Sequence, residues 1–202
     1  METVKTRREQ YAQSTRQALL DTGLEFFVER GYPAVSAEEL VRAAGLTRGA
    51  LYHHFDGKQG LFEAVFEEQE RRAAALIAEA MAAHDDLWQR ALTGLDTFLD
   101  VCADRDYREI VVLQGPIALG WERWRELDQR HLGGLLVGSV RALLDAGLVK
   151  PYPVGLAAAA LYGALTELAL AAARTDDPAQ TRRQAGRLVH GLLQGLRPAD
   201  AG

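Results

Sequence analysis

The sequence predicts an all-α protein of about nine helices. Hydrophobic residues make up 48% of the 202-residue chain, and only six prolines interrupt it. Alanine and leucine are the dominant residues, and that composition favours helices. Apolar residues also recur at spacings of three and four over most of the chain, which is the period of a helix with one buried face. The length is sufficient to bury a sizeable core in one or two domains.

Two short helices are predicted around a glycine turn in the first third of the chain. Ser36 and Glu39 have the spacing of a capping box, so the first helix starts at Ser36. Gly45 follows this helix, where a left-handed backbone is needed and glycine adopts it at low cost. Thr47 is a suitable N-cap for a second helix that ends near Phe55. Two short helices joined in this way predict a helix-turn-helix.

The second of these helices has a polar, basic outer face. Leu51 and Phe55 are four residues apart and share its buried side. The residues left facing solvent or a partner are Arg48, Gly49, Tyr52, His53 and Lys58. A preceding helix from about Glu9 to Arg30 is expected to pack behind the pair and to hold it at a fixed angle.

The stretch AAGLTRGALYHHFDGKQGLF resembles the DNA-binding segment of the TetR family of bacterial transcriptional regulators, of the TetR/AcrR type. The positions that match the family pattern are Ala44, Gly45, Leu46, Thr47, Gly49, Leu51, Tyr52, His54, Phe55, Lys58 and Leu61. The agreement in spacing is specific and covers about the first third of the chain. Two positions are less usual for the family, because Val41 replaces an alanine and Asp56 adds a negative charge near the expected phosphate contacts.

The resemblance implies a homodimeric repressor in the cytoplasm. Residues 1–56 would form the DNA-binding domain and residues 57–202 a helical domain for ligand binding and dimerisation. The implied DNA-contacting residues are Ser36, Thr47, Arg48, Gly49, Ala50, Tyr52, His53, His54 and Lys58. Among them Arg48 is the candidate for a direct base contact, because arginine pairs bidentately with guanine.

The implied partners are a palindromic double-stranded operator and a small, largely apolar effector that releases the protein from it. An effector among the middle helices would tilt the long helix that begins near Asp56, provided that it binds the state without DNA more tightly. Two alternatives stay open from the residues themselves. One is a helical ligand-binding protein without DNA-binding activity, and the other is a small helical enzyme.

The charge of the chain does not by itself predict a nucleic-acid partner. The net charge is −5, yet residues 1–60 hold eight basic and eight acidic side chains, so the acidity lies in residues 61–202. DNA binding would therefore depend on the placement of basic groups at one end of the molecule, and affinity should fall steeply with salt. The basic residues 1–8 are either a disordered tail or an arm that contacts DNA.

The helical period predicts the remaining elements. Asp56 is a plausible N-cap, with Gln59 as its capping-box partner. The later helices are expected at residues 56–83, 87–104, 107–114, 117–147, 154–173 and 179–196. The third of these is expected to close at Gly115-Pro116.

The apolar segment 154–173 has the length of a membrane span. Its high alanine content and Glu167, which costs roughly 2.5–3.5 kcal/mol in a bilayer, favour a buried helix of a helical bundle. The last two helices carry small residues at close spacing, Gly155, Ala159, Gly163, Gly186, Gly191 and Gly195. Tight packing within one subunit is one explanation, and a dimer interface through these two helices is the favoured one.

Aromatic and polar residues of the middle helices predict an effector pocket, since such pockets combine apolar walls with a few polar groups. The candidate pocket residues are Trp88, Phe98, Cys102, Tyr107, Trp121, Trp124 and His131. Cys102, the single cysteine, is expected to be a buried thiol. Asp128 and His131 have metal-ligand spacing but no second cluster accompanies them, and no catalytic motif is visible. We therefore expect no metal, no cofactor and no catalytic residue.

Overall fold

The computed structural model describes residues 7–175 and 177–198, and these residues are helical except for short connections. The elements are α1 (Arg7–Arg30), η1 (Tyr32–Ala34), α2 (Ala37–Ala43), α3 (Arg48–His54), α4 (Gly57–Ala82), α5 (Leu87–Ala103), α6 (Arg105–Tyr107), η2 (Arg108–Gln114), α7 (Gly115–Leu119), α8 (Trp121–Asp128), η3 (Gln129–Gly133), α9 (Gly134–Asp145), α10 (Val154–Ala173) and α11 (Pro178–Gly195). Because α6, η2 and α7 are continuous, as are α8, η3 and α9, the described chain forms nine main rods. The predicted all-α class is confirmed.

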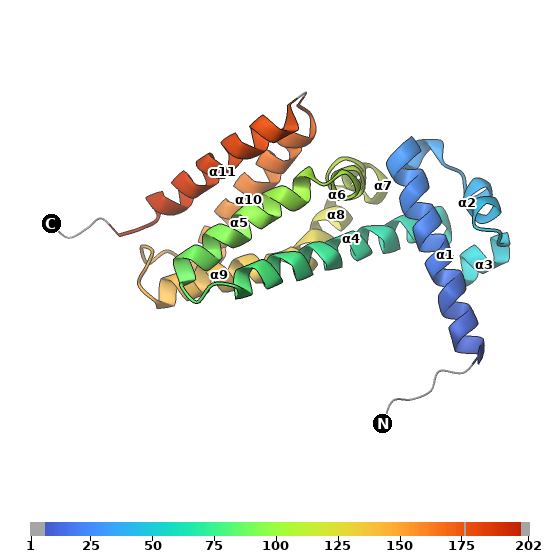
Figure 1. Cartoon of the computed structure of the whole chain (residues 1–202), viewed down its shortest axis with the longest axis horizontal. Coiled ribbons are helices and arrows are strands. Elements are labelled where there is room, and N and C mark those ends of the chain that lie inside the picture. The colour runs from blue at the N-terminus through green and yellow to red at the C-terminus, as the bar shows by residue number, and fades with distance from the viewer. Residues whose placement is uncertain (1–6, 176, 199–202) are drawn as a thin grey trace.

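The first three helices lie at one end of the molecule, and α10 and α11 lie toward the other (Figure 1). The 26-residue helix α4 connects these ends and is about 39 Å long at 1.5 Å per residue. One hydrophobic core joins α1, α2, α3 and α4 to the middle helices, and it includes Phe27, Phe62 and Phe66. A second core lies between α5, α9, α10 and α11. The end of the molecule that carries α1, α2 and α3 is therefore packed directly against the rest of the chain.

The predicted capping box at the start of α4 is wrong. Asp56 occupies the N-cap position, but its side chain accepts no capping hydrogen bond. Gly57 follows with a φ of 67°, which turns the chain before the helix begins. The tyrosine ring of Tyr52 lies against this glycine, 3.4 Å from the position of an added Cβ.

The predicted helix end at Gly115-Pro116 is also wrong. The chain passes through this dipeptide as a helix and stops only at Gly120, whose φ is 79°. Gly115 is required for packing, because an added Cβ would lie 2.6 Å from Cδ1 of Trp124. Pro116 stands in the first turn of α7, where its missing N–H matters least.

Helix α10 differs from the predicted buried helix. Within the part of the chain that the structure describes, it is the one helix long and apolar enough to cross a membrane, by length and composition only. Only 22% of that apolar window is buried. The buried residues are Ala158, Leu161, Leu165 and Ala169, all on one side of the helix. The other side has no cover within one subunit.

The proposed N-terminal arm falls largely on residues 1–6, which lie outside the described residues. Arg7 and Arg8, the last two residues of that arm, already belong to α1.

Candidate nucleic-acid interface and interior cavity

The helix-turn-helix is built as its sequence predicts. The Ser36 hydroxyl accepts a bond from the Glu39 N–H at 3.2 Å, and the Ser36 N–H donates to Glu39 Oε2 at 2.9 Å. Arg30 also donates to Glu39 at 2.7 Å, and these contacts, with Arg30 first, lower the pKa of Glu39 to about 2. The carboxylate is thus charged near neutral pH and holds the start of α2 against α1.

The turn between α2 and α3 depends on Gly45, whose φ is 66°. Its N–H donates to the Arg42 carbonyl at 3.1 Å, and the Leu46 N–H donates to the Val41 carbonyl at 2.8 Å. This pair of bonds is a Schellman motif, which satisfies the last carbonyls of a helix. Thr47 then caps α3 by accepting a bond from the Ala50 N–H at 3.3 Å. The crossing of the two helices is therefore set by local bonds.

The outer face of α3 presents Arg48 and Tyr52. Leu51 is fully buried, whereas Tyr52 is 52% exposed. The Arg48 guanidinium lies 5.6 Å from the centre of the Tyr52 ring and forms an ion pair at 2.9 Å with Glu38 of α2. Sequence reasoning missed this acidic partner, because Glu38 lies ten residues away and is brought close only by the turn.

Lys58 has an additional structural contact. Its ammonium donates to the carbonyl oxygens of Tyr32 and Val35, both at 2.9 Å, and lies 4.1 Å from the centre of the Tyr32 ring. These bonds fasten the start of α4 to the segment between α1 and α2. A phosphate contact by Lys58 remains a prediction, and it would have to share the ammonium with these carbonyls.

The remaining predicted DNA contacts lie on the same end of the molecule. The hydroxyl groups of Ser36 and Thr47 are engaged in capping, as described above. Gly49 and His53 are exposed, and Ala50 and His54 are half-buried. Burial, with a smaller effect of His53 and Arg16, lowers the pKa of His54, so that His54 is neutral at pH 7. The local geometry thus offers Arg48, Tyr52 and His53 as the most accessible groups.

A buried polar side chain also links this end to the middle helices. Gln114, the last residue of η2, accepts a bond from the Tyr32 N–H at 2.7 Å and donates to the Phe27 carbonyl at 2.9 Å. The amide therefore satisfies two backbone groups at the end of α1. The contact ties the end of η2 to the end of α1.

Replacing Gln114 with alanine is expected to lower the free energy of unfolding by about 2 kcal/mol, since two backbone groups would lose their partner. Urea unfolding followed by circular dichroism measures the change. Gln59→Ala is the matched control, because the Gln59 amide is exposed and makes one longer bond of 3.3 Å to the Ala118 carbonyl. Equal losses in the two variants would contradict the assigned role of Gln114.

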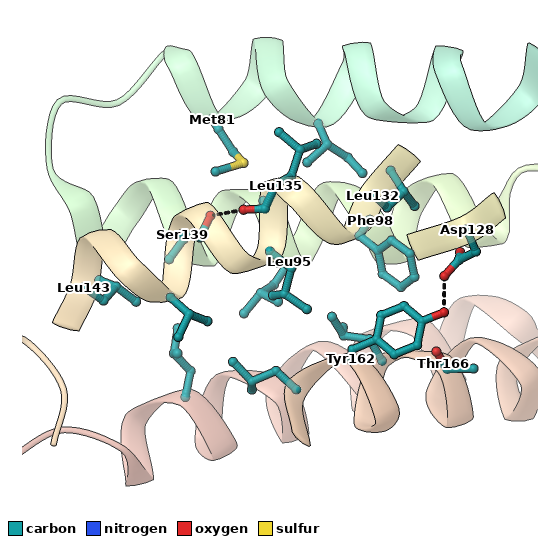
Figure 2. A pocket seen from close by; sticks show the side chains of 18 residues that line it. Met81, Leu95, Phe98, Asp128, Leu132, Leu135, Ser139, Leu143, Tyr162 and Thr166 are labelled. Atoms are coloured by element: carbon teal, nitrogen blue, oxygen red, sulfur yellow. Dashed lines mark hydrogen bonds between the residues drawn. The ribbon is translucent and has the colours of Figure 1, made fainter. Parts of the chain in front are cut away.

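An interior cavity lies between α4, α5, α9, α10 and α11. Its volume is about 70 Å³. Most of its wall is apolar and consists of Ile77, Met81, Ala91, Gly94, Leu95, Phe98, Leu132, Leu135, Leu136, Val140, Leu143, Leu161, Leu165 and Leu193. Its polar members are Asp128, Ser139, Tyr162 and Thr166 (Figure 2).

Of the seven residues predicted for a pocket, only Phe98 lines this cavity. Trp121 is 49% exposed, and Trp124 is buried with its indole N–H bonded to the Val111 carbonyl at 2.9 Å. Trp88 packs under Arg197, 4.4 Å from the ring centre. Their assignment to an effector pocket stays a prediction, because aromatic residues on helices mark buried surface and the pattern does not reveal which neighbour covers them.

The other three predicted pocket residues also lie outside the cavity wall. Cys102 is buried, as predicted, beside a smaller hollow next to Arg108. Tyr107 is 3% exposed and donates to Glu70. His131 places its Nε2 atom 3.8 Å from Glu67. The leucine wall was missed because leucines at helical spacing look the same whether they fill a core or line a cavity.

A pair of buried carboxyl groups lies at one end of the cavity. Asp128 accepts a bond from the Tyr162 hydroxyl, and Glu70 accepts one from the Tyr107 hydroxyl at 3.2 Å. The two carboxyls also interact directly, so one of them has to carry a proton. Burial is the main cause that raises the pKa of both groups, and the neighbouring Asp128 charge raises the pKa of Glu70 further. Glu70 is the protonated partner.

The pKa shift of Glu70 has a consequence for stability. A carboxyl whose pKa is raised in the folded state binds more protons when folded, so its stabilising contribution is complete below about pH 4.5 and is lost as pH rises toward the folded pKa. Glu70→Gln is therefore expected to stabilise the protein at pH 8 and to change little at pH 4.5. Urea unfolding at both values tests this. Glu122→Gln, which removes an exposed carboxylate of α8, should show no such dependence.

Comparison with known proteins matches both parts of the chain to one family. Residues 19–65 match the bacterial regulatory proteins of the tetR family, and residues 88–196 match the tetracyclin repressor-like C-terminal domain. The transposon Tn10 TetC protein of Escherichia coli is 26% identical over 196 residues, covering 96% of this chain and 98% of that protein.

Solved structures show the same fold. A TetR-family transcriptional regulator from Pectobacterium atrosepticum has a TM-score of 0.82 and 29% identity, with coverage of 96% of this chain and 99% of the other. The regulator FadR from Bacillus subtilis, in complex with stearoyl-CoA, has a TM-score of 0.72 and 19% identity, with coverage of 88% and 96%. Together with the helix-turn-helix geometry, these matches show that the chain belongs to the TetR family of bacterial regulatory proteins and is a DNA-binding transcriptional regulator.

Proposed function

We propose that this protein is a homodimeric repressor that binds a palindromic operator in the cytoplasm and leaves it when a small, largely apolar ligand enters the interior cavity. Residues 1–56 form the DNA-binding domain, and residues 57–202 form the domain for ligand binding and dimerisation. The observation that carries the proposal is the exposed pair Arg48 and Tyr52 on the outer face of a capped α3. The Arg48 side chain is 64% exposed although it pairs with Glu38, so its guanidinium is accessible to a partner.

The uncovered faces of α10 and α11 support a dimer through these helices. Leu156 of α10 is 70% exposed, and Leu188 and Leu192 of α11 are 54% and 43% exposed. An added Cβ at Gly155, Gly163, Gly191 or Gly195 would meet no atom within 4 Å. These small residues therefore do not serve close packing inside one subunit, although Gly186 does face Arg182 and Asp96. Apolar patches of this kind mark interfaces, and a two-fold pair of subunits presents two reading helices.

The cavity supports ligand control because two structural connections join it to the end of the molecule that carries the helix-turn-helix. The first is α4, which supplies both a cavity wall and Lys58. The second is the carboxyl pair, which holds Tyr107 at the start of η2, and η2 ends at Gln114. A ligand shifts the protein away from DNA only if it binds the DNA-free arrangement more tightly. The Bacillus subtilis regulator FadR, which shares this fold, has a crystal structure in complex with stearoyl-CoA, a ligand that carries a long acyl chain.

Selection from randomised double-stranded DNA tests the proposed function. The expected product is an inverted repeat, with an affinity for the purified protein that falls steeply as salt rises. Binding to a single half-site should be much weaker than binding to the full repeat. The absence of any selected sequence would favour the alternatives, a helical ligand-binding protein or a helical enzyme that does not bind DNA.

A further inference from the structure

The polar groups of the cavity are gathered at one end. Figure 2 shows Asp128, Tyr162 and Thr166 together beside Phe98, with Leu143 at the opposite end. Thr166 lies beside Tyr162, whose hydroxyl donates to Asp128. Ser139, further along the wall, uses its hydroxyl to donate to the carbonyl of Leu135 at 2.9 Å. The cavity therefore has one polar end and a long apolar body.

The apolar body follows one face of the α8, η3 and α9 rod. Wall residues from Asp128 to Leu143 on this rod are Asp128, Leu132, Leu135, Leu136, Ser139, Val140 and Leu143. Leu143 stands 15 positions after Asp128, which corresponds to roughly 22 Å at 1.5 Å per residue. The wall thus follows the length of an extended apolar ligand with a single polar group at one end, and such a ligand would have to widen the 70 Å³ cavity.

The charge at the polar end is negative. Asp128 is 7% exposed and Glu70 behind it is 0% exposed, and the second carboxyl oxygen of Glu70 has no hydrogen-bond donor facing it. Neither carboxyl forms an ion pair with any basic residue that the structure describes. Arg125 lies over the Tyr162 ring at 5.0 Å, and His131 is directed to Glu67. Arg125 and His131 act on Asp128 only at longer range, and a buried carboxylate without an ion-paired cation is costly.

We propose that the ligand of this cavity is an elongated lipophilic amine whose ammonium binds Asp128 and whose apolar body lies along the leucine wall. The ammonium has three N–H donors, and the carboxylate of Asp128 and the hydroxyl oxygens of Tyr162 and Thr166 supply three acceptors. An anionic head group would instead place a further negative charge beside Asp128 and Glu70. This proposal rests on the proposed function only where it gives the cavity a regulatory role. The ligand class itself depends on the cavity alone.

Calorimetric titration of the full-length protein without DNA tests the ligand class. The probes are dodecylamine and dodecanoate, used below their micelle concentrations, which differ only in the head group. We expect the amine to bind at least tenfold more tightly than the carboxylate. Asp128→Asn keeps an acceptor for Tyr162 and should weaken amine binding at least tenfold. Equal affinity for the two probes, or unchanged amine affinity in Asp128→Asn, would overturn the proposal.

Two further variants separate the cavity from general attraction to an acidic protein. Glu122→Gln removes one exposed carboxylate from the same rod and should leave amine affinity unchanged. Leu135→Trp fills the apolar body and should abolish amine binding while thermal unfolding remains cooperative. Amine binding that persists in Leu135→Trp would show that the amine binds elsewhere, and would overturn the assignment to this cavity.

The role in regulation is measured in a separate step. Operator DNA selected as described above is bound first, and dodecylamine is then added. Release of the DNA by dodecylamine, but not by dodecanoate, supports both proposals. Tight binding of the amine without release of the DNA would contradict the effector role but would still support the ligand class. Release by dodecanoate, with no amine binding, would leave the repressor function standing and overturn the ligand class.

Discussion

Replacing both Leu188 and Leu192 with glutamate is expected to convert the proposed dimer into a monomer and to reduce operator affinity on the order of 10³-fold. Both side chains are exposed in one subunit, so the fold of the monomer does not depend on them. In a dimer they would be buried against the partner, where unpaired carboxylates are strongly unfavourable. A monomer contacts one half-site only and gives up the contacts with the second half-site, which accounts for a large loss.

The change in mass is measured by analytical ultracentrifugation, and operator affinity by fluorescence anisotropy. Leu76→Glu is the matched control, because Leu76 is 55% exposed but lies on α4, away from α10 and α11. The control should remain dimeric and keep its operator affinity. A double variant that stays dimeric would place the dimer interface on another surface.

Arg48→Ala and Tyr52→Ala are each expected to weaken operator binding on the order of 10- to 100-fold while the dimer stays intact. The two side chains form one exposed unit, since the guanidinium lies 5.6 Å from the tyrosine ring centre. Arginine supplies bidentate donors to a guanine edge, and tyrosine supplies a hydroxyl for a phosphate. Loss of Arg48 should also relax base preference at one operator position, whereas loss of Tyr52 should weaken all sequences alike.

A change of opposite sign is expected from Glu38→Gln. In the DNA-free protein this carboxylate holds Arg48 at 2.9 Å, and the arginine has to leave it to contact DNA. Removing the charge should raise operator affinity by at most about fivefold, because exposed ion pairs are weak. Fluorescence anisotropy at constant salt measures all three variants. Arg72→Ala removes a positive charge from the middle of α4 and should change nothing, and a loss there equal to that of Arg48→Ala would indicate general electrostatics.

Lys58→Ala is expected to act in two ways. It removes a phosphate contact that the family resemblance implies, and it also frees the carbonyl groups of Tyr32 and Val35. Weaker DNA binding should therefore be accompanied by a lower melting temperature, measured by circular dichroism. Unchanged stability would contradict the structural contacts of the ammonium.

The helix-turn-helix could be derived almost completely from local sequence. Ser36, Gly45 and Thr47 act on residues at most five positions away, through caps and a turn whose chemistry is the same in any protein. The same reasoning failed at Asp56, because the positive φ of Gly57 takes the chain out of the geometry that a capping box requires. It failed again at Gly115, whose small size serves contact with Trp124 rather than a helix end.

The cavity and its charge could not be derived in this way. Glu70 was detectable in principle, since it lies at helical spacing between Phe66 and Ala73, on the buried side of α4. Its partner Asp128 stands 58 positions later in the chain, and periodicity does not specify which helix faces which. The same applies to α11, where Leu193 enters the core while the adjacent Leu192 remains exposed.

The composition, helical period and local caps were thus enough to establish an all-α chain with a helix-turn-helix in its first third, because each of these signals acts over a few residues. The ion pair of Glu38 with Arg48, the link through Gln114, the leucine-walled cavity and its carboxyl pair depend on contacts between distant segments. Such contacts are settled by how the helices pack as a whole, since each amphipathic helix could bury its apolar face against several partners.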